Sequence, residues 1–564
     1  MNHEGQPGTA PSPRDAVQAA LSRRGFLAMG GAAFAVASAS SLLAACSSEG
    51  TVSKGTNGAG ASDKLTIGVF QEPDTLDPNA TGLALSSFIA SAIYDPLMWY
   101  LPKEGGGYEF VSGLAESYEV SADATTYTFK LRKDVKFHDG TKFDANSVKA
   151  TMDHIVDPAT KSRSAIGSLG PYKATKILDA YTAQVVFEAP NAAFAHEMTT
   201  ILFGMSSPEA LKKYGPTTIG RNPVGTGPFK FVSYATQDNV TLERNPDYKW
   251  APASFGNNGP AKLKSLTFKI LTDTKARYSA LRAGQLGLVM NLDPNDIASI
   301  KAGKQFKHYN VPSTGQPYGY PLNVDKEPTN ELEVRQAILH AVNQDEMIKS
   351  VLRGAYEPAH NLLTPTTPGY SEAAAKRYPY DQEKAKSLLE SAGWKVGAGG
   401  VREKNGKPLH LDILIQSSNG FDLPTQYVES ELKKVGFSTK ISAQPFLTAA
   451  ASYNKGVQNL SAIFYYDVDP YFLLGLTGCD AVASGFNWAH YCDRENDKSL
   501  ADANTITDEK KRNAQLEAAT TKLMEQAIFL PLWNVSGVYS AVNNLSGLHF
   551  GATGYAFLHS AQLT

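Results

Sequence analysis

Cysteine is scarce in this chain of 564 residues, which carries only Cys46, Cys479 and Cys492. So few thiols exclude a thiolate-bound zinc site, and no set of Cys and His residues has zinc-ligand spacing. The metalloprotease motif H-E-x-x-H, the hydrolase turn G-x-S-x-G and a phosphate-binding glycine loop are also missing. The sequence therefore predicts no metal and no cofactor. It favours a protein that is not an enzyme, although a catalytic triad can be assembled in space without a motif.

An excess of charge of either sign is missing as well. The chain has 53 Lys and Arg against 55 Asp and Glu, a net charge of −2. A nucleic-acid partner would require a basic face, so none is expected. Beyond Cys46 no apolar run approaches the roughly 20 residues that cross a bilayer. The body after that point is too long for a single hydrophobic core, which predicts two or three domains.

The N-terminal segment is typical of an export signal. Arg23 and Arg24 precede a mildly apolar Gly/Ala/Ser-rich run and small residues before Cys46. A stable membrane span would instead be rich in Leu, Ile, Val and Phe. The stretch 22–27, "SRRGFL", resembles the twin-arginine signal, with the general export route as the alternative. The stretch 43–46, "LAAC", resembles a bacterial lipobox.

That resemblance implies that Cys46 becomes the first residue of the mature protein and carries a lipid anchor. We therefore expect a twin-arginine lipoprotein signal peptide at 1–45. A flexible tether follows at 46–64, where Ser, Gly, Thr and Ala dominate. The alternative is an uncleaved helix with an incidental cysteine. In an exported protein, Cys479 and Cys492 are expected to form a disulfide that closes a small loop.

Strand-like and helix-like stretches alternate along the body, which indicates a mixed α/β fold. "KLTIGVF" (64–70) has the alternation of a strand, and the stretch 127–131 places Tyr, Phe and Leu on one face. Asn330 and Glu333 suggest a capping box for a helix that runs through Ile348. Asp381 is expected to cap a helix that stops at Gly393, and a similar helix ends at Gly436.

Several stretches together resemble the extracytoplasmic solute-binding proteins of the peptide, dipeptide and nickel family, family 5, which serve ABC importers. They occur in family order: "YTFKLRKDVKFHDGTKFDANSV" (127–148), "NPVGTGPFKF" and "LERNPDYKW" (222–250), "RYSALRAGQL" (277–286), "LEVRQAILHAVNQDEMI" (332–348), "YDQEKAKSLLESAGW" (380–394) and "DPYF" (469–472). The spacing of Cys479 and Cys492 is similar to the cysteine loop of dipeptide-binding proteins.

The resemblance implies an α/β, periplasmic-binding-protein-like fold with two hinged lobes and an additional inserted subdomain. A solute would be enclosed between the lobes on closure. The implied boundaries are 65–88, 222–315 and 538–564 for the first lobe, 89–221 for the inserted subdomain and 316–537 for the second lobe. The implied protein is a lipid-anchored, extracytoplasmic monomer at the cell membrane, with the transmembrane subunits of an ABC permease as partner.

The ligand is expected near "IFYYDVDPYF" (463–472), where aromatic residues meet two aspartates. In peptide binders of this family an aspartate four residues before the proline of the D-P pair meets the amino terminus of the ligand. Here that position is Tyr466, and Asp467 follows it. Asp469 is expected to cap the next segment. The candidates for ligand contact are Phe70, Gln71, Glu72, Phe446, Tyr465, Tyr466 and Asp467. The aromatic ones could instead pack in the core.

A second difference from the peptide binders of the family concerns the region that would bind the carboxylate end of a ligand. Dipeptide binders carry an arginine in the region corresponding to 411–430, and this chain has none there. An unpaired buried carboxylate is costly, so a free dipeptide is a poor fit. The leading hypothesis is a receptor for a peptide-like solute. An oligosaccharide, an opine-like compound or a metal chelate is the alternative cargo, and a surface-anchored hydrolase or an adhesive lipoprotein is the alternative class.

Overall fold

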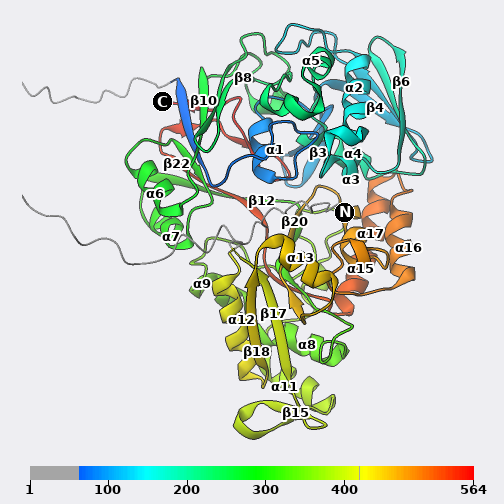
Figure 1. Cartoon of the computed structure of the whole chain (residues 1–564), viewed down its shortest axis with the longest axis vertical. Coiled ribbons are helices and arrows are strands. Elements are labelled where there is room, and N and C mark those ends of the chain that lie inside the picture. The colour runs from blue at the N-terminus through cyan, green and yellow to red at the C-terminus, as the bar shows by residue number, and fades with distance from the viewer. Residues whose placement is uncertain (1–62, 418–419) are drawn as a thin grey trace, which may run out of the picture. The chain divides into compact units, whose positions relative to one another are not determined.

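The computed structural model describes residues 63–417 and 420–564. Its largest sheet has seven strands in the order β12-β22-β11-β1-β10-β9-β8 (Figure 1). The central strand β1 is parallel to both neighbours, β10 and β11, and the other pairs are antiparallel. The strands are β1 (Lys64–Val69), β8 (Phe229–Ala235), β9 (Asn239–Arg244), β10 (Ser265–Ile270), β11 (Leu288–Met290), β12 (Phe306–Pro312) and β22 (Ser536–Val542).

The strand predicted at 64–70 is thus confirmed as β1, with Ile67 and Val69 fully buried. The core of this sheet includes Phe88 of α1 (Ala84–Ala90), whose ring meets that of Phe268 edge-on at 5.6 Å. Helices α6 (Thr274–Arg282) and α7 (Pro294–Ala302) flank β11 in sequence. The sheet draws its strands from three stretches of the chain, and β22 begins two residues before the segment expected from the resemblance.

A four-stranded antiparallel sheet lies within the stretch between β1 and β8. Its order is β4-β5-β7-β6, and Tyr127, Phe129 and Leu131 of β5 point into one core, as the alternation predicts. The elements of this stretch are β2 (Met98–Pro102), β3 (Tyr108–Ser112), β4 (Ala115–Val120), β5 (Thr126–Leu131), β6 (Tyr172–Asp179), β7 (Thr182–Phe187), α2 (Ala145–Val156), α3 (Ala165–Leu169), α4 (Phe194–Glu197) and α5 (Pro208–Thr218).

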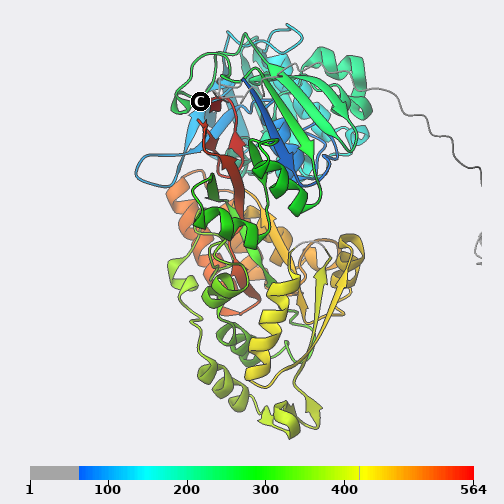
Figure 2. The ribbon, with the colours of Figure 1, turned by 90° about the vertical axis from the view of Figure 1, so that its left-hand side faces the viewer.

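Besides a three-stranded sheet of the short strands β14 (Lys395–Val396), β15 (Arg402–Lys404) and β16 (Lys407–Pro408), the second lobe contains two further three-stranded sheets and most of the helices. In one sheet β13 (Gly315–Pro321) lies between β20 (Ile463–Tyr466) and β21 (Phe529–Trp533). In the other, β17 (His410–Gln416) is parallel to both β18 (Ser438–Gln444) and β19 (Leu460–Ser461). Helix α12 (Asp422–Lys434) packs beside β18, as Figure 2 shows. Helices α16 (Arg494–Ala503) and α17 (Glu509–Glu525) lie side by side.

The described part contains further α-helices and strands, most of them short. They are α8 (Leu332–Ala341), α9 (Gln344–Ser350), α10 (Glu372–Ala375), α11 (Gln382–Ser391), α13 (Phe446–Asn454), α14 (Leu473–Thr477), α15 (Ala481–Ser484), β23 (Leu545–Ser546), β24 (His549–Phe550), β25 (Ala556–Phe557) and β26 (Gln562–Leu563). Within the described ranges, no helix is both long and apolar enough to cross a membrane.

One predicted helix is wrong in two respects. The expected capping box of Asn330 and Glu333 does not form, because the N-cap of α8 is Glu331 and its side chain makes no capping bond. The helix also stops at Ala341 and a second one, α9, begins at Gln344. The side chain of Asn343 accepts a hydrogen bond from the N–H of Glu346, so it caps a new helix where continuation was expected. The Asp381 cap is confirmed.

The chain crosses between the seven-stranded sheet and the second lobe at two adjacent places. Ser313 and Thr314 join β12 to β13, and Asn534 and Val535 join β21 to β22. The two crossings are hydrogen-bonded to each other, from the N–H of Ser313 to the carbonyl of Val535 (3.1 Å). The predicted class is thus confirmed: two α/β lobes are joined by paired crossings, and a further subdomain is inserted in the first lobe.

Candidate functional site

The loop after β20 lies where three parts of the fold meet. Val468 is buried in a small apolar cluster with Tyr100 of β2 and Ala552, which follows β24. The N–H of Asp467 donates to the carbonyl of Thr314 in the first crossing (3.4 Å). Asp467 and Asp469 flank Val468, so both carboxyl groups are held next to this junction. The predicted site residues Tyr465, Tyr466 and Asp467 therefore lie between the two lobes and the inserted subdomain.

Asp469 is completely buried and is the acceptor of four hydrogen bonds. Arg512 of α17 donates to both carboxylate oxygens (2.6 and 2.7 Å), and Nδ1 of His196 lies 2.9 Å from Oδ2. The N–H of Tyr471 donates to Oδ1 (2.9 Å), which confirms the predicted capping role. Burial alone would raise the pKa of Asp469, but Arg512 and His196 outweigh it and hold that pKa well below its ordinary value.

Asp467 has the opposite environment. Burial raises its pKa to about 6, and the nearby charge of Asp469 adds to the rise. The carboxyl group of Glu197, at the end of α4, hydrogen-bonds that of Asp467. Glu197 is itself only 6% exposed, and its burial, together with the charge of Asp467, raises its pKa well above the ordinary range. The raised pKa values of both groups favour a hydrogen bond in which Glu197 keeps its proton and Asp467 accepts it.

Helix α4 is fixed against the second lobe by Asn504, which follows α16. The N–H of Ala193 donates to the side-chain oxygen of Asn504 and that of Ala192 to its main-chain carbonyl, both at 2.8 Å. The side-chain amide of Asn504 in turn donates to the carbonyl of Pro190 (3.3 Å). Because these contacts and the His196–Asp469 bond are buried, Glu197 is held in place opposite Asp467.

Aromatic rings form a wall beside the same loop. The ring of Tyr318 on β13 is stacked between those of Phe464 (4.1 Å) and Trp533 (4.5 Å). Tyr466 is close enough to Tyr318 for their hydroxyl groups to interact. Burial raises the pKa of Tyr466 far above its ordinary value, so the phenol is neutral. A wall of neutral rings with a carboxyl pair at one end suits a ligand with an apolar body and a cationic end.

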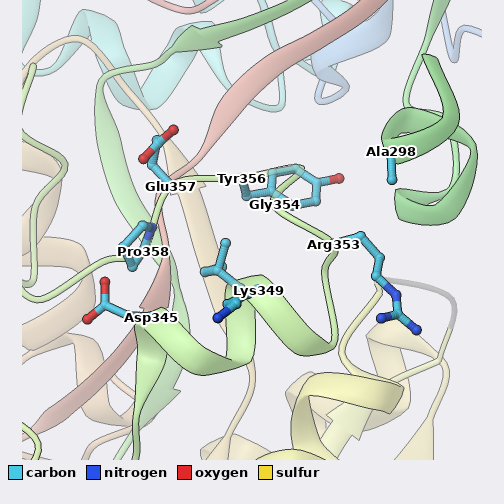
Figure 3. Close-up of a pocket in the computed structure, with 9 residues that line it drawn as sticks. Ala298, Asp345, Lys349, Arg353, Gly354, Tyr356, Glu357 and Pro358 are labelled. Carbon is cyan, nitrogen blue, oxygen red and sulfur yellow. The ribbon is translucent and has the colours of Figure 1, made fainter. Parts of the chain in front are cut away.

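A cavity of about 450 Å³ adjoins this wall (Figure 3). Tyr356 lines it, and the ring of Tyr356 lies 6.2 Å from that of Trp533. Lys349 and Arg353 also line it, and Figure 3 shows the guanidinium of Arg353 pointing away from the ring of Tyr356. None of the residues predicted to bind a ligand is part of this lining.

The other predicted contacts are placed elsewhere. Phe70 is half-buried and packs on the core of the seven-stranded sheet, and Gln71 beside it is half-buried. Glu72 accepts hydrogen bonds from the hydroxyl of Tyr234 (2.9 Å) and the N–H of Gln237 (3.1 Å), both in the β8–β9 region. Its carboxylate is thus already engaged within the first lobe. Phe446, the first residue of α13, is 46% exposed.

Tyr465 packs against the core of the second lobe, with its ring 5.3 Å from that of Phe472. The disulfide between Cys479 and Cys492 is formed, as predicted. Cys46, Arg23 and Arg24 lie outside the described residues.

The sequence interpretation missed Glu197, His196 and Arg512. Their only local signal is weak: Arg512 stands four residues before the buried Leu516 on one helix face, where an apolar residue would be expected. His196 and Glu197 belong to a short helix without a distinctive pattern. The aspartates were visible in the sequence, but their partners lie 43 and 273 residues away.

Comparison with known proteins places this geometry in a family. The family model of the bacterial extracellular solute-binding proteins, family 5, middle region, matches residues 109–483. The glutathione-binding protein GsiB of Escherichia coli O1:K1 is 28% identical over 558 residues, which cover 95% of this chain and 98% of that protein. Di/tripeptide-binding protein 1 of Pseudomonas aeruginosa is 32% identical over 454 residues, 76% of this chain and 81% of that protein.

Among solved structures, NikA from Brucella suis in complex with Fe(III)-EDTA superimposes with a TM-score of 0.79 at 25% identity. The match covers 89% of this chain and all of that one. Two crossings between α/β lobes, an inserted subdomain and the matched middle region agree with one another. The chain belongs to the bacterial extracellular solute-binding proteins of family 5.

Proposed function

We propose that this protein is the receptor of an ABC importer and captures a peptide-like solute between its two lobes. The observation that carries the proposal is the position of Asp467, at the end of the aromatic wall and at the junction of the lobes. A carboxylate there would pair with the amino group of a peptide, and the stacked rings would hold its apolar part. The proposal assigns the acidic group to Asp467 and not to Tyr466, whose buried phenol is neutral, and it requires a loop that is one residue shorter than in peptide binders.

The relatives support a peptide cargo, since GsiB is named for glutathione and the Pseudomonas protein for di- and tripeptides. A non-peptide cargo has support of its own. The stretch 411–430 contains no arginine, and the NikA structure holds Fe(III)-EDTA. A chelate or another solute without a free carboxylate end would need no such cation.

Thermal unfolding of residues 47–564 would separate the two cargoes. The panel is alanine tripeptide, glutathione, a maltooligosaccharide and Fe(III)-EDTA. A ligand at about 100 times its dissociation constant stabilises the folded state by about 2.7 kcal/mol, which is a visible shift. Stabilisation by peptides alone supports the proposal, whereas stabilisation by the chelate or the sugar alone refutes the peptide cargo. Conversion of a bound peptide into products would instead favour a hydrolase.

We further propose that the receptor is anchored to the outer side of the cell membrane through a lipid on Cys46 and delivers its solute to a permease. The lipobox-like stretch 43–46 supports this anchor. The lobe boundaries expected from the family belong to the same proposal. Cys46→Ser should move the exported protein from the membrane fraction to the soluble fraction, and continued tight membrane association of that variant would refute the anchor.

A further inference from the structure

Glu197 is a buried carboxyl group that the proposed binding mode does not use. It comes from the inserted subdomain, and it meets Asp467, which comes from the second lobe. Near Glu197, the hydrogen bonds between His196 and Asp469 and between Ala193 and Asn504 hold the inserted subdomain against the second lobe. Because Glu197 is 94% buried and hydrogen-bonded to the carboxyl group that would hold the ligand, it cannot be a solvated surface charge.

The groups around Glu197 decide what it does. Asp467 and Asp469 face it from the loop after β20, Arg512 from α17, Tyr465 from β20 and Ser168 from α3. The positive charge of Arg512 is already committed to Asp469 through two short hydrogen bonds. His196 uses Nδ1 for Asp469, and its buried Nε2 has no hydrogen-bond partner among the described residues. Within the described residues, the groups that act on the Glu197–Asp467 pair include no cation other than Arg512. The two carboxyl groups can therefore lie together only if one of them keeps a proton.

We propose that Glu197 is a specificity-determining residue of the amino-end site. In the ligand-free protein it holds a proton against Asp467, and it releases that proton to solvent when a cationic amino group binds. The captured ammonium then pairs with two carboxylates. This inference rests on the proposed function, since it assigns the amino end of the solute to Asp467. It also predicts preference for ligands whose end is cationic over ligands whose end is neutral.

The consequence is a binding affinity that rises with pH. A ligand that displaces one proton binds about tenfold more tightly for each pH unit over the range in which the free pair is protonated and the bound pair is not. The raised pKa of Glu197 sets the upper end of that range. Below about pH 6 Asp467 becomes protonated as well, so that a bound ammonium group must displace a second proton there. Below pH 7 the α-amino group of a peptide, with an ordinary pKa of about 7.7–8.0, stays protonated and adds little to the slope.

Calorimetry with alanine tripeptide at pH 5, 6 and 7 tests the proposal. At each pH the binding heat is measured in buffers of different ionisation enthalpy, which counts the protons released. At pH 7 the wild type should release up to one proton per peptide, and Glu197→Gln, which can still donate a hydrogen bond to Asp467, should release almost none. At pH 5 the protonated fraction of Asp467 adds to the release in both proteins, so the difference between them reports the Glu197 proton. Glu119→Gln, an exposed site on β4 of the same subdomain, is the matched control and should keep the wild-type slope. N-acetylated alanine tripeptide should bind weakly and release no proton.

A ligand-free measurement separates this inference from the proposed function. The difference between the infrared spectra of the free wild type and of Glu197→Gln at pH 7 should contain a protonated-carboxyl band. Absence of that band from the difference spectrum, or equal proton release by wild type and Glu197→Gln at pH 7, overturns the inference alone. Failure of the tripeptide and glutathione to bind overturns the proposed cargo and, with it, the capture of an amino end by this pair.

Discussion

Asp467 and Asp469 are separated by a single valine, yet their carboxyl groups have opposite electrostatic environments. Asp469 is enclosed by Arg512, His196 and a backbone N–H, so its charge is fully compensated. Asp467 faces Glu197 and has no cation of its own, so its charge is disfavoured. A buried carboxylate with a built-in counter-charge, such as Asp469, stabilises the fold. Asp467 has no such counter-charge, and the function proposed above assigns that role to the cationic end of the ligand.

The largest effect should come from removing the counter-charge of Asp469. Arg512→Met leaves that carboxylate buried and unpaired, which should lower the free energy of unfolding by about 3–5 kcal/mol in urea. Adding Asp469→Leu to the same protein should recover much of the loss. The control is Arg494→Met, which breaks an exposed pair with Asp480 and should change stability little. Equal losses in the two single variants would contradict the structural role of the Arg512–Asp469 pair.

A smaller loss is expected from His196→Phe. The replacement keeps a ring next to Tyr100 and Phe110 but removes the hydrogen bond to Asp469, at a cost of about 1.5–3 kcal/mol at pH 7. An aspartate with a depressed pKa stabilises the fold fully above the ordinary value of about 3.9, and this contribution is lost as the pH falls towards its folded pKa. The gap between wild type and variant should therefore narrow in acid. A gap that widens below pH 4 would show that Asp469 is not the partner that matters.

The smallest effect has the opposite sign. Asp467→Asn should stabilise the ligand-free protein at pH 7 by less than about 3 kcal/mol, the free energy that a rise of about two pKa units represents, because the raised pKa means that ionisation of Asp467 costs free energy in the fold. That cost begins as the pH rises above the ordinary aspartate value and is complete above about pH 6, so the gain should vanish below pH 4. Asp247→Asn, at an exposed site, is the control. The same Asp467 variant should bind peptides weakly, and a variant that is less stable than wild type at pH 7 would contradict this account.

Local patterns in the sequence predicted the elements that depend on local contacts. The alternation of 127–131, the Asp381 cap and the Asp469 cap all follow from interactions within a few residues. The capping box at Asn330 was wrong, since α8 begins one residue later, with Glu331 as an N-cap that makes no side-chain bond. The predicted length was wrong because Asn343 caps a new helix, α9. The disulfide was predicted because only two cysteines remain after Cys46 and because export was expected.

The candidate site was only half accessible to such reasoning. Asp467 was visible because of its place before the D-P pair. Glu197 and Arg512 could not be identified from the sequence, because their roles depend on burial against segments that are distant along the chain. Glu72 shows the opposite error, because it was chosen without knowledge of its surroundings. It was a candidate for ligand contact, yet its carboxylate already accepts hydrogen bonds from Tyr234 and Gln237.

The order in which the chain is made has a bearing on how the first lobe can be completed. Strand β22, residues 536–542, lies between β11 and β12 in the seven-stranded sheet and pairs with both. Until that stretch has been synthesised, β11 and β12 have no common neighbour, and the sheet must wait with an open edge while the whole second lobe forms. Contacts of such long sequence separation slow folding and prolong the exposure of unpaired edges. The exposed edges of β11 and β12 therefore persist until residues 536–542 have been added, and any chaperone that assists folding would have to cover them until then.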